Sequence, residues 1–147
     1  MGVGRVRPSA GSKALLVTGV LLLAFLFLPW EIVVRSQPFL GIEGRTVYDS
    51  AFGSPLGVIV GIVAIAVVAW EAMLAAGMTL RPGNVSPATV GAVGGSLVSL
   101  LTVVLFLSTL GDTAWGAFLG VATGVAVAYS SYLRFREGGT ARPSPPG

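Results

Sequence analysis

The chain contains no cysteine and no histidine. Without cysteine it cannot form disulfides, thiolate nucleophiles or thiolate metal sites. Without histidine it also cannot build a Ser–His or Cys–His pair, or the usual zinc and haem ligand sets. We therefore expect no catalytic residues, no metal ligands and no cofactor. A membrane enzyme that uses only carboxylates and hydroxyls is the least favoured alternative.

Charge is also scarce. Only 10% of the 147 residues are charged and 54% are hydrophobic, whereas a soluble domain has about 25% charged residues. The net charge of +3 comes from nine basic residues that form no patch or stripe along the sequence, so nucleic acid is not an expected partner. The composition places the chain in the membrane class.

Four apolar stretches are long enough to cross a hydrocarbon core, which takes about 20 helical residues. They cover residues 14–30, 55–78, 86–110 and 113–133. Ser86 before Pro87 is typical of a helix start, and Gly111 before Asp112 is typical of a helix end followed by a new cap. The predicted fold is an all-α membrane protein, a four-transmembrane-helix bundle whose third and fourth spans form a tight hairpin.

The first span has a second interpretation. Arg5, Arg7 and Lys13 followed by a short apolar run also describe a secretory signal peptide. The run ends in LPWEIV, which lacks a pair of small residues suited to cleavage. We expect an uncleaved first span.

The basic residues indicate the orientation, because short cytoplasmic flanks are enriched in Lys and Arg. One side would carry Arg5, Arg7, Lys13, Arg81, Arg134, Arg136 and Arg142, and the other only Arg35 and Arg45. This predicts a multi-pass protein of the cell membrane with both termini cytoplasmic. The tails, residues 1–13 and 134–147, are rich in Gly, Pro, Ser and Arg, and we expect them to be disordered.

The outer loop, residues 31–54, is the only sizeable hydrophilic segment between spans. In it, EIVVRS and RTVYDS bracket QPFLGIEG, which contains Pro and Gly. This pattern fits a short β-hairpin over the outer face of the bundle. An irregular ordered loop fits it equally well.

A glycine pattern occurs twice, as GSPLGVIVG from Gly53 and as GAFLGVATG from Gly116. An internal duplication and chance similarity both account for it. In lipid, helices associate by close packing at small residues, so we predict helix contacts at Gly57, Gly61, Gly91, Gly95, Gly116, Gly120 and Gly124. These contacts could lie within one bundle or between copies. Because the second and fourth spans run in the same direction, we expect them to cross as parallel neighbours at Gly57 and Gly120.

Glu71 and Arg134 each follow one of these glycines by fourteen residues. Fourteen helical residues rise about 21 Å and return to nearly the same face. The two side chains are therefore predicted at one depth, as a candidate intramembrane ion pair. A steep helix crossing would separate them, with Arg81, Tyr129 or Ser130 as substitute partners. An intramembrane carboxylate also marks a possible functional site, so a proton or ligand role for Glu71 is the alternative to structural pairing.

Four short sequences stand at the span boundaries: LPW, AFG from Ala51, AWE ending at Glu71, and YLRFREG from Tyr132. Together they resemble a group of small four-span membrane proteins of actinobacterial type. The resemblance implies the fold and no functional residues. The expected function is that of a non-enzymatic accessory or structural component, which engages a membrane protein partner or self-associates in the lipid bilayer. The alternative is a small proton-coupled transporter or channel that uses Glu71.

Overall fold

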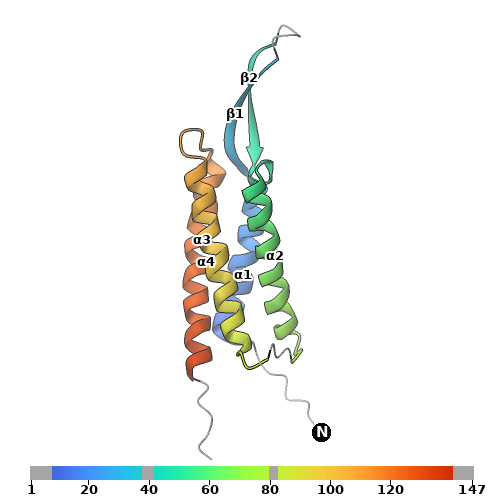
Figure 1. Ribbon diagram of the computed structural model, residues 1–147, viewed down its shortest axis with the longest axis vertical. Helices are drawn as coiled ribbons and strands as arrows, with labels where there is room; N and C mark the ends of the chain where they lie inside the picture. Colours follow the sequence, from blue (N-terminus) through green and yellow to red (C-terminus); the bar gives the residue numbers. More distant parts are fainter. Residues whose placement is uncertain (1–7, 38–41, 80–82, 141–147) are drawn as a thin grey trace, which may run out of the picture.

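The computed structural model describes residues 8–37, 42–79 and 83–140. Four α-helices lie side by side along the long axis, and a β-hairpin projects from one end (Figure 1). The elements are α1 (Ala10–Leu26), β1 (Pro29–Gln37), β2 (Ile42–Ser50), the short 3-10 helix η2 (Ala51–Gly53), α2 (Pro55–Ala75), α3 (Pro87–Ser108) and α4 (Trp115–Thr140). The described chain is thus mostly helical, with one two-stranded sheet.

Serine caps begin three of the helices. The hydroxyls of Ser9, Ser54 and Ser86 accept hydrogen bonds from the backbone three residues further on, at the first turns of α1, α2 and α3. Each cap satisfies an amide that has no partner within its helix. In α2 and α3 a proline occupies the first helical position, where its missing N–H costs nothing.

The helices pack in the cyclic order α1, α2, α3, α4. Each contacts its two neighbours in this order, and α4 closes the ring by packing on α1. Among the described residues, α2 and α4 are therefore diagonal rather than adjacent. The expected crossing of these spans at Gly57 and Gly120 is wrong, because other parts of the chain occupy those glycines.

Three predicted boundaries differ from those of the structure. The first span was expected to reach Trp30, but α1 ends at Leu26 and Trp30 lies in β1. Pro29 has no N–H to continue the helical hydrogen bonds, and the amide of Phe27 instead bonds back to Ala24. The tails expected to be disordered are ordered where the structure describes them: α1 begins within residues 8–13, and α4 continues through residues 134–140. Residues 1–7 and 141–147 lie outside the described residues.

The outer loop is a hairpin, as one of the two interpretations held. β1 and β2 are antiparallel, with Ile32 opposite Tyr48 and Val34 opposite Thr46. The base of β1 is joined to the α3–α4 turn, because the amide of Ile32 donates to the Asp112 carbonyl (2.7 Å) and that of Ala114 donates to the Trp30 carbonyl (2.8 Å). The hairpin is thereby fixed to the bundle by backbone hydrogen bonds.

The core has two layers of buried apolar side chains. The layer nearer the hairpin contains Leu26, Trp30, Ala51, Val60, Leu105 and Ala117. The other contains Leu15, Leu22, Ala64, Val67, Val98 and Val127. Below this second layer, at the end away from the hairpin, the core becomes polar.

Candidate functional site

Glu71 lies in the core at the end of the bundle opposite the hairpin. Its side chain is 0% exposed, and both carboxylate oxygens have partners. Arg134 Nε donates to Oε1 (3.1 Å), and the Ser12 hydroxyl donates to Oε2 (2.6 Å). Because an unpaired carboxylate is costly in this environment, these contacts from α4 and α1 allow a residue of α2 to be buried as an anion. The ion pair spans the diagonal of the bundle.

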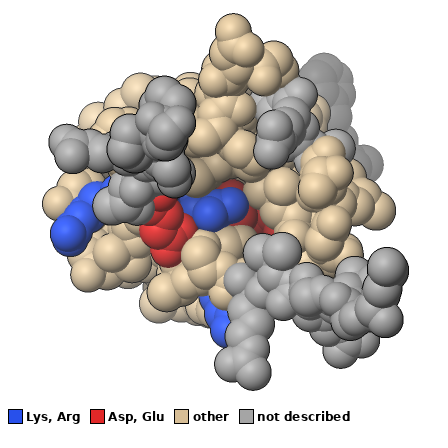
Figure 2. Space-filling view, turned by 90° about the horizontal axis from the view of Figure 1, so that it is seen from below, with Lys and Arg blue, Asp and Glu red and all other residues tan. Residues whose placement is uncertain are grey.

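A second set of contacts joins this pair to the surface. Arg134 Nη1 donates to Ser9 Oγ (3.1 Å) and to Glu137 Oε2 (3.3 Å). Glu137 also accepts from the Ser9 hydroxyl (2.7 Å) and from the Gly11 amide (2.8 Å). We call these five residues, Ser9, Ser12, Glu71, Arg134 and Glu137, the inner network. In Figure 2, which looks onto this end, acidic groups gather near the middle and basic groups lie both there and at the rim.

Glycines make room for the inner network. A Cβ at Gly91 of α3 would overlap the Glu71 carboxylate, and a Cβ at Gly11 would stand 2.8 Å from Glu137 Oε2 and 3.0 Å from the Arg134 amide nitrogen. A side chain at either position would displace a charged group. The missing side chain at Gly91 therefore leaves space for Glu71 of α2 to reach Arg134 of α4 across the bundle.

The glycines of the repeated pattern receive the ends of the hairpin. A Cβ at Gly57 would overlap the Ala51 carbonyl, and one at Gly61 would stand 2.6 Å from the Phe52 ring. On α4, Gly116 faces the Pro29 carbonyl and Gly120 faces the Trp30 indole. We call these four glycines the outer cradles. They were expected to pack helix against helix, and instead each pair holds the chain that enters or leaves the hairpin.

The remaining two predicted packing glycines do face other helices. Gly95 of α3 faces Ser131 of α4 and Leu15 of α1, and Gly124 of α4 faces Thr102 of α3. The Gly124 carbonyl also accepts a hydrogen bond from Ser99 (2.8 Å). Close approach at Gly95 and Gly124 thus serves contact between helices within one bundle.

Of the substitute partners considered for Glu71, Arg81 lies outside the described residues. Tyr129 is 64% exposed, and the Ser130 hydroxyl donates to the Ala126 carbonyl (2.8 Å). Sequence reasoning missed Ser9, Ser12 and Glu137. The spacing of Glu137, three residues after Arg134 and so on nearly the same face of α4, was a usable signal. Nothing in the sequence singles out Ser12 from other serines near span ends.

Every side chain of the inner network takes part in at least one hydrogen bond. Within residues 8–37, 42–79 and 83–140, no buried side-chain nitrogen or oxygen lacks a partner. The same residues contain no group of three or more His, Cys, Asp or Glu placed to hold a metal ion. This arrangement suits a structural junction, because buried polar groups that satisfy one another fix a single geometry.

The helices define the class of protein. Three of them, α2, α3 and α4, are long and apolar enough to cross a membrane, and α1 is apolar but shorter, at 17 residues. The chain is therefore an integral, multi-pass membrane protein. No protein-family model, no curated protein and no solved structure significantly matches it.

Proposed function

We propose that the chain is a non-enzymatic component of the cell membrane that engages a protein partner through its hairpin. The observation that carries this proposal is the hairpin itself. It projects beyond the helices (Figure 1), and backbone hydrogen bonds fix its base to the α3–α4 turn. A two-stranded hairpin is only marginally stable by itself. Its firm attachment to the bundle therefore holds an ordered surface beyond the ends of the helices.

The side chains of the hairpin support a binding role. Val34 and Tyr48 are 65% and 60% exposed and lie on the same face, since Val34 pairs with Thr46 and Tyr48 with Ile32. In the described chain the sheet has only these two strands. An open strand edge beside exposed apolar groups is a surface that proteins use to add a strand from a partner.

The proposal includes four spans and cytoplasmic termini. The excess of basic residues beside the inner network favours the cytoplasm on that side. At about 1.5 Å per residue, α1 measures about 25 Å. The helix α1 packs between α2 and α4, and the inner network holds its first turn. Both observations support α1 as a shortened span that completes the set of four.

Photo-crosslinking tests the proposed contact. A photoreactive amino acid placed at Val34 or Tyr48 is expected to give a discrete crosslinked band in native membranes. The same group at Ala66, an exposed position in the middle of α2, is the matched control. Differently sized tags on two co-expressed copies separate self-association from a second protein. Equal labelling at all three positions, or none, contradicts the proposal.

A second candidate is proton-coupled transport through Glu71. It is favoured by the burial of Glu71, an intramembrane carboxylate, and by a second carboxylate nearby, since Glu137 contacts the same Arg134 guanidinium and is only partly buried. Proteoliposomes with a pH gradient distinguish the two. Proton flux that Glu71→Gln abolishes supports transport, and absence of flux in a correctly folded protein supports the structural role.

A further inference from the structure

The surface has a step where α1 begins. Ala10 starts α1 at the level of the inner network, since Gly11 contacts Glu137, whereas α4 continues past Arg134 to Thr140. The last turns of α4 therefore extend beyond the first turn of α1. Because the hydrocarbon core is about 30 Å thick and α1 spans about 25 Å, this step falls near the boundary between acyl chains and headgroups.

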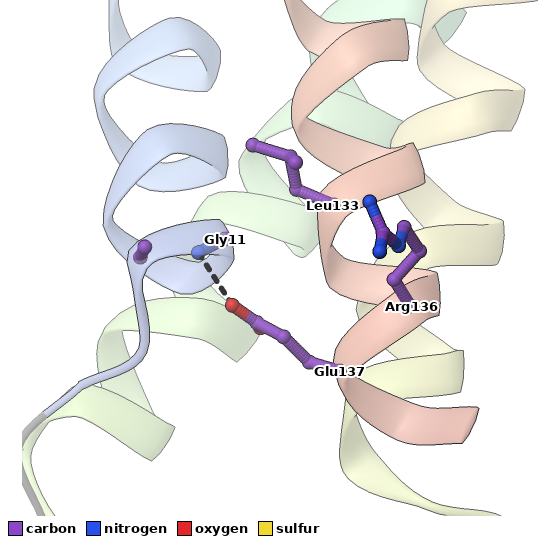
Figure 3. A pocket seen from close by; sticks show the side chains of 5 residues that line it. Gly11, Leu133, Arg136 and Glu137 are labelled. Atoms are coloured by element: carbon purple, nitrogen blue, oxygen red, sulfur yellow. Dashed lines mark hydrogen bonds between the residues drawn. The ribbon is translucent and has the colours of Figure 1, made fainter. Parts of the chain in front are cut away.

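An open pocket of about 260 Å³ occupies the step. Ala10, Gly11, Leu133, Arg136 and Glu137 line it. In Figure 3, Leu133 points toward α1, Glu137 reaches the Gly11 amide, and Arg136 extends beside α4. The pocket thus combines an apolar wall with charged groups, as the junction of an acyl chain and a headgroup requires.

The accessible charge around this pocket is positive. Glu137 turns toward α1, and its oxygens accept from Gly11, Ser9 and Arg134. Arg136 is exposed, and so is Lys13, which is three residues after Ala10 and lies on nearly the same side of α1. Arg136 therefore lines the pocket and Lys13 lies about one helical turn from Ala10 of its wall, while the oxygens of the one carboxylate of the pocket, Glu137, are turned toward donors from Ser9, Gly11 and Arg134.

We propose that this pocket binds the headgroup of an anionic phospholipid, with Lys13 and Arg136 contacting its phosphate and Leu133 its first acyl carbons. Basic residues at a membrane surface attract anionic lipids, and each adds to the affinity. A bound lipid would fill the step that the short α1 leaves beside α4. The inference is independent of the proposed role of the hairpin.

Thermal stability in detergent, titrated with lipid, tests the inference, because a ligand that binds the folded state raises the melting temperature. Phosphatidylglycerol is expected to stabilise the full chain, and phosphatidylcholine with the same acyl chains is not. In the Lys13→Gln/Arg136→Gln variant, the half-saturating concentration of phosphatidylglycerol should rise on the order of thirtyfold, from about 1 kcal/mol for each basic residue. Arg35→Gln/Arg45→Gln, which removes the same charge from the hairpin, is the matched control and should leave the titration unchanged.

Several results would overturn the inference: equal stabilisation by both lipids, an equal loss in the control variant, or the same shift from inorganic phosphate alone, which would indicate a soluble anion. If the double variant does not fold, the unaltered chain still decides the question. Its half-saturating concentration must rise with added salt, because exposed charges are screened. A titration that salt does not change rejects a contact based on charge.

Discussion

At one end of the bundle, Glu71 and Arg134 join diagonal helices by charge, and at the other end Gly57 and Gly120 receive the hairpin by shape. The inner network works because its buried polar atoms have partners at hydrogen-bonding distance. The outer cradles work because no side chain is present where a carbonyl or an indole must fit. The two ends should therefore fail for different reasons, one when charge is unbalanced and the other when volume is added.

The largest effect is expected from Arg134→Gln. Removing one member of a buried ion pair leaves the other charge without compensation, which typically costs about 3–5 kcal/mol. The variant should show a strongly lowered melting temperature in detergent. The double variant Glu71→Gln/Arg134→Gln should recover part of the loss, because two amides can hydrogen bond without net charge. If the double variant is as unstable as the sum of the single ones, charge balance does not explain the inner network.

The next effect is expected at Gly57, where even one methyl group would overlap the Ala51 carbonyl. Because a backbone atom must move, Gly57→Ala should destabilise the protein by about 1–3 kcal/mol. Gly139→Ala, which meets no atom within 4 Å, is the matched control for the loss of a glycine. Equal melting temperatures for both variants would show that the outer cradles do not depend on volume.

Gly61 offers a sharper comparison with Gly57, because a second substitution at the neighbouring side chain can make room for the added Cβ. Its added Cβ would meet the edge of the Phe52 ring, a partly buried side chain rather than the backbone. Gly61→Ala should therefore cost less than Gly57→Ala, about 1 kcal/mol. In a Phe52→Leu background the cost of Gly61→Ala should disappear, as measured by a double-mutant cycle of melting temperatures. Additive effects would place the contact elsewhere.

An effect between those of Gly57→Ala and Gly61→Ala is expected at a hydroxyl of the inner network. Ser12→Ala removes the partner of Glu71 Oε2 and should cost about 1.5 kcal/mol, in the range for hydrogen bonds to charged groups. Ser96→Ala is the control, since Ser96 donates only within its own helix and is exposed. A loss of stability at Ser96 equal to that at Ser12 would remove any special role for Ser12.

The sequence indicated the helical segments because apolar runs bounded by Ser–Pro and Gly–Asp carry their own start and stop signals. It also placed Glu71 and Arg134 at one depth, since helical rise depends only on residue number. The packing order could not be read in the same way. A glycine indicates a close contact but does not identify the group that makes it. At Gly57 and Gly120 that group belongs to the chain next to the hairpin.

The end of the first span was missed for a related reason. LLLAFLFLPW is apolar throughout, and hydropathy does not separate the last helical turn from a buried strand residue. Trp30 is buried because Gly120 leaves space for its ring, and its Nε1 donates to the Phe25 carbonyl (2.8 Å). The contact between Trp30 and Gly120 joins residues ninety positions apart, and no local sequence pattern indicates it.

The diagonal position of the ion pair has a consequence for biosynthesis. Glu71 leaves the ribosome long before Arg134, so the carboxylate lacks its cationic partner until α3 and most of α4 have been synthesised. A chain that stops before the fourth helix carries Glu71 in the membrane without Arg134, its partner in the complete bundle. Quality-control machinery that recognises unpaired intramembrane charge would thus have a built-in marker of incomplete synthesis, one that disappears only when the last helix is in place.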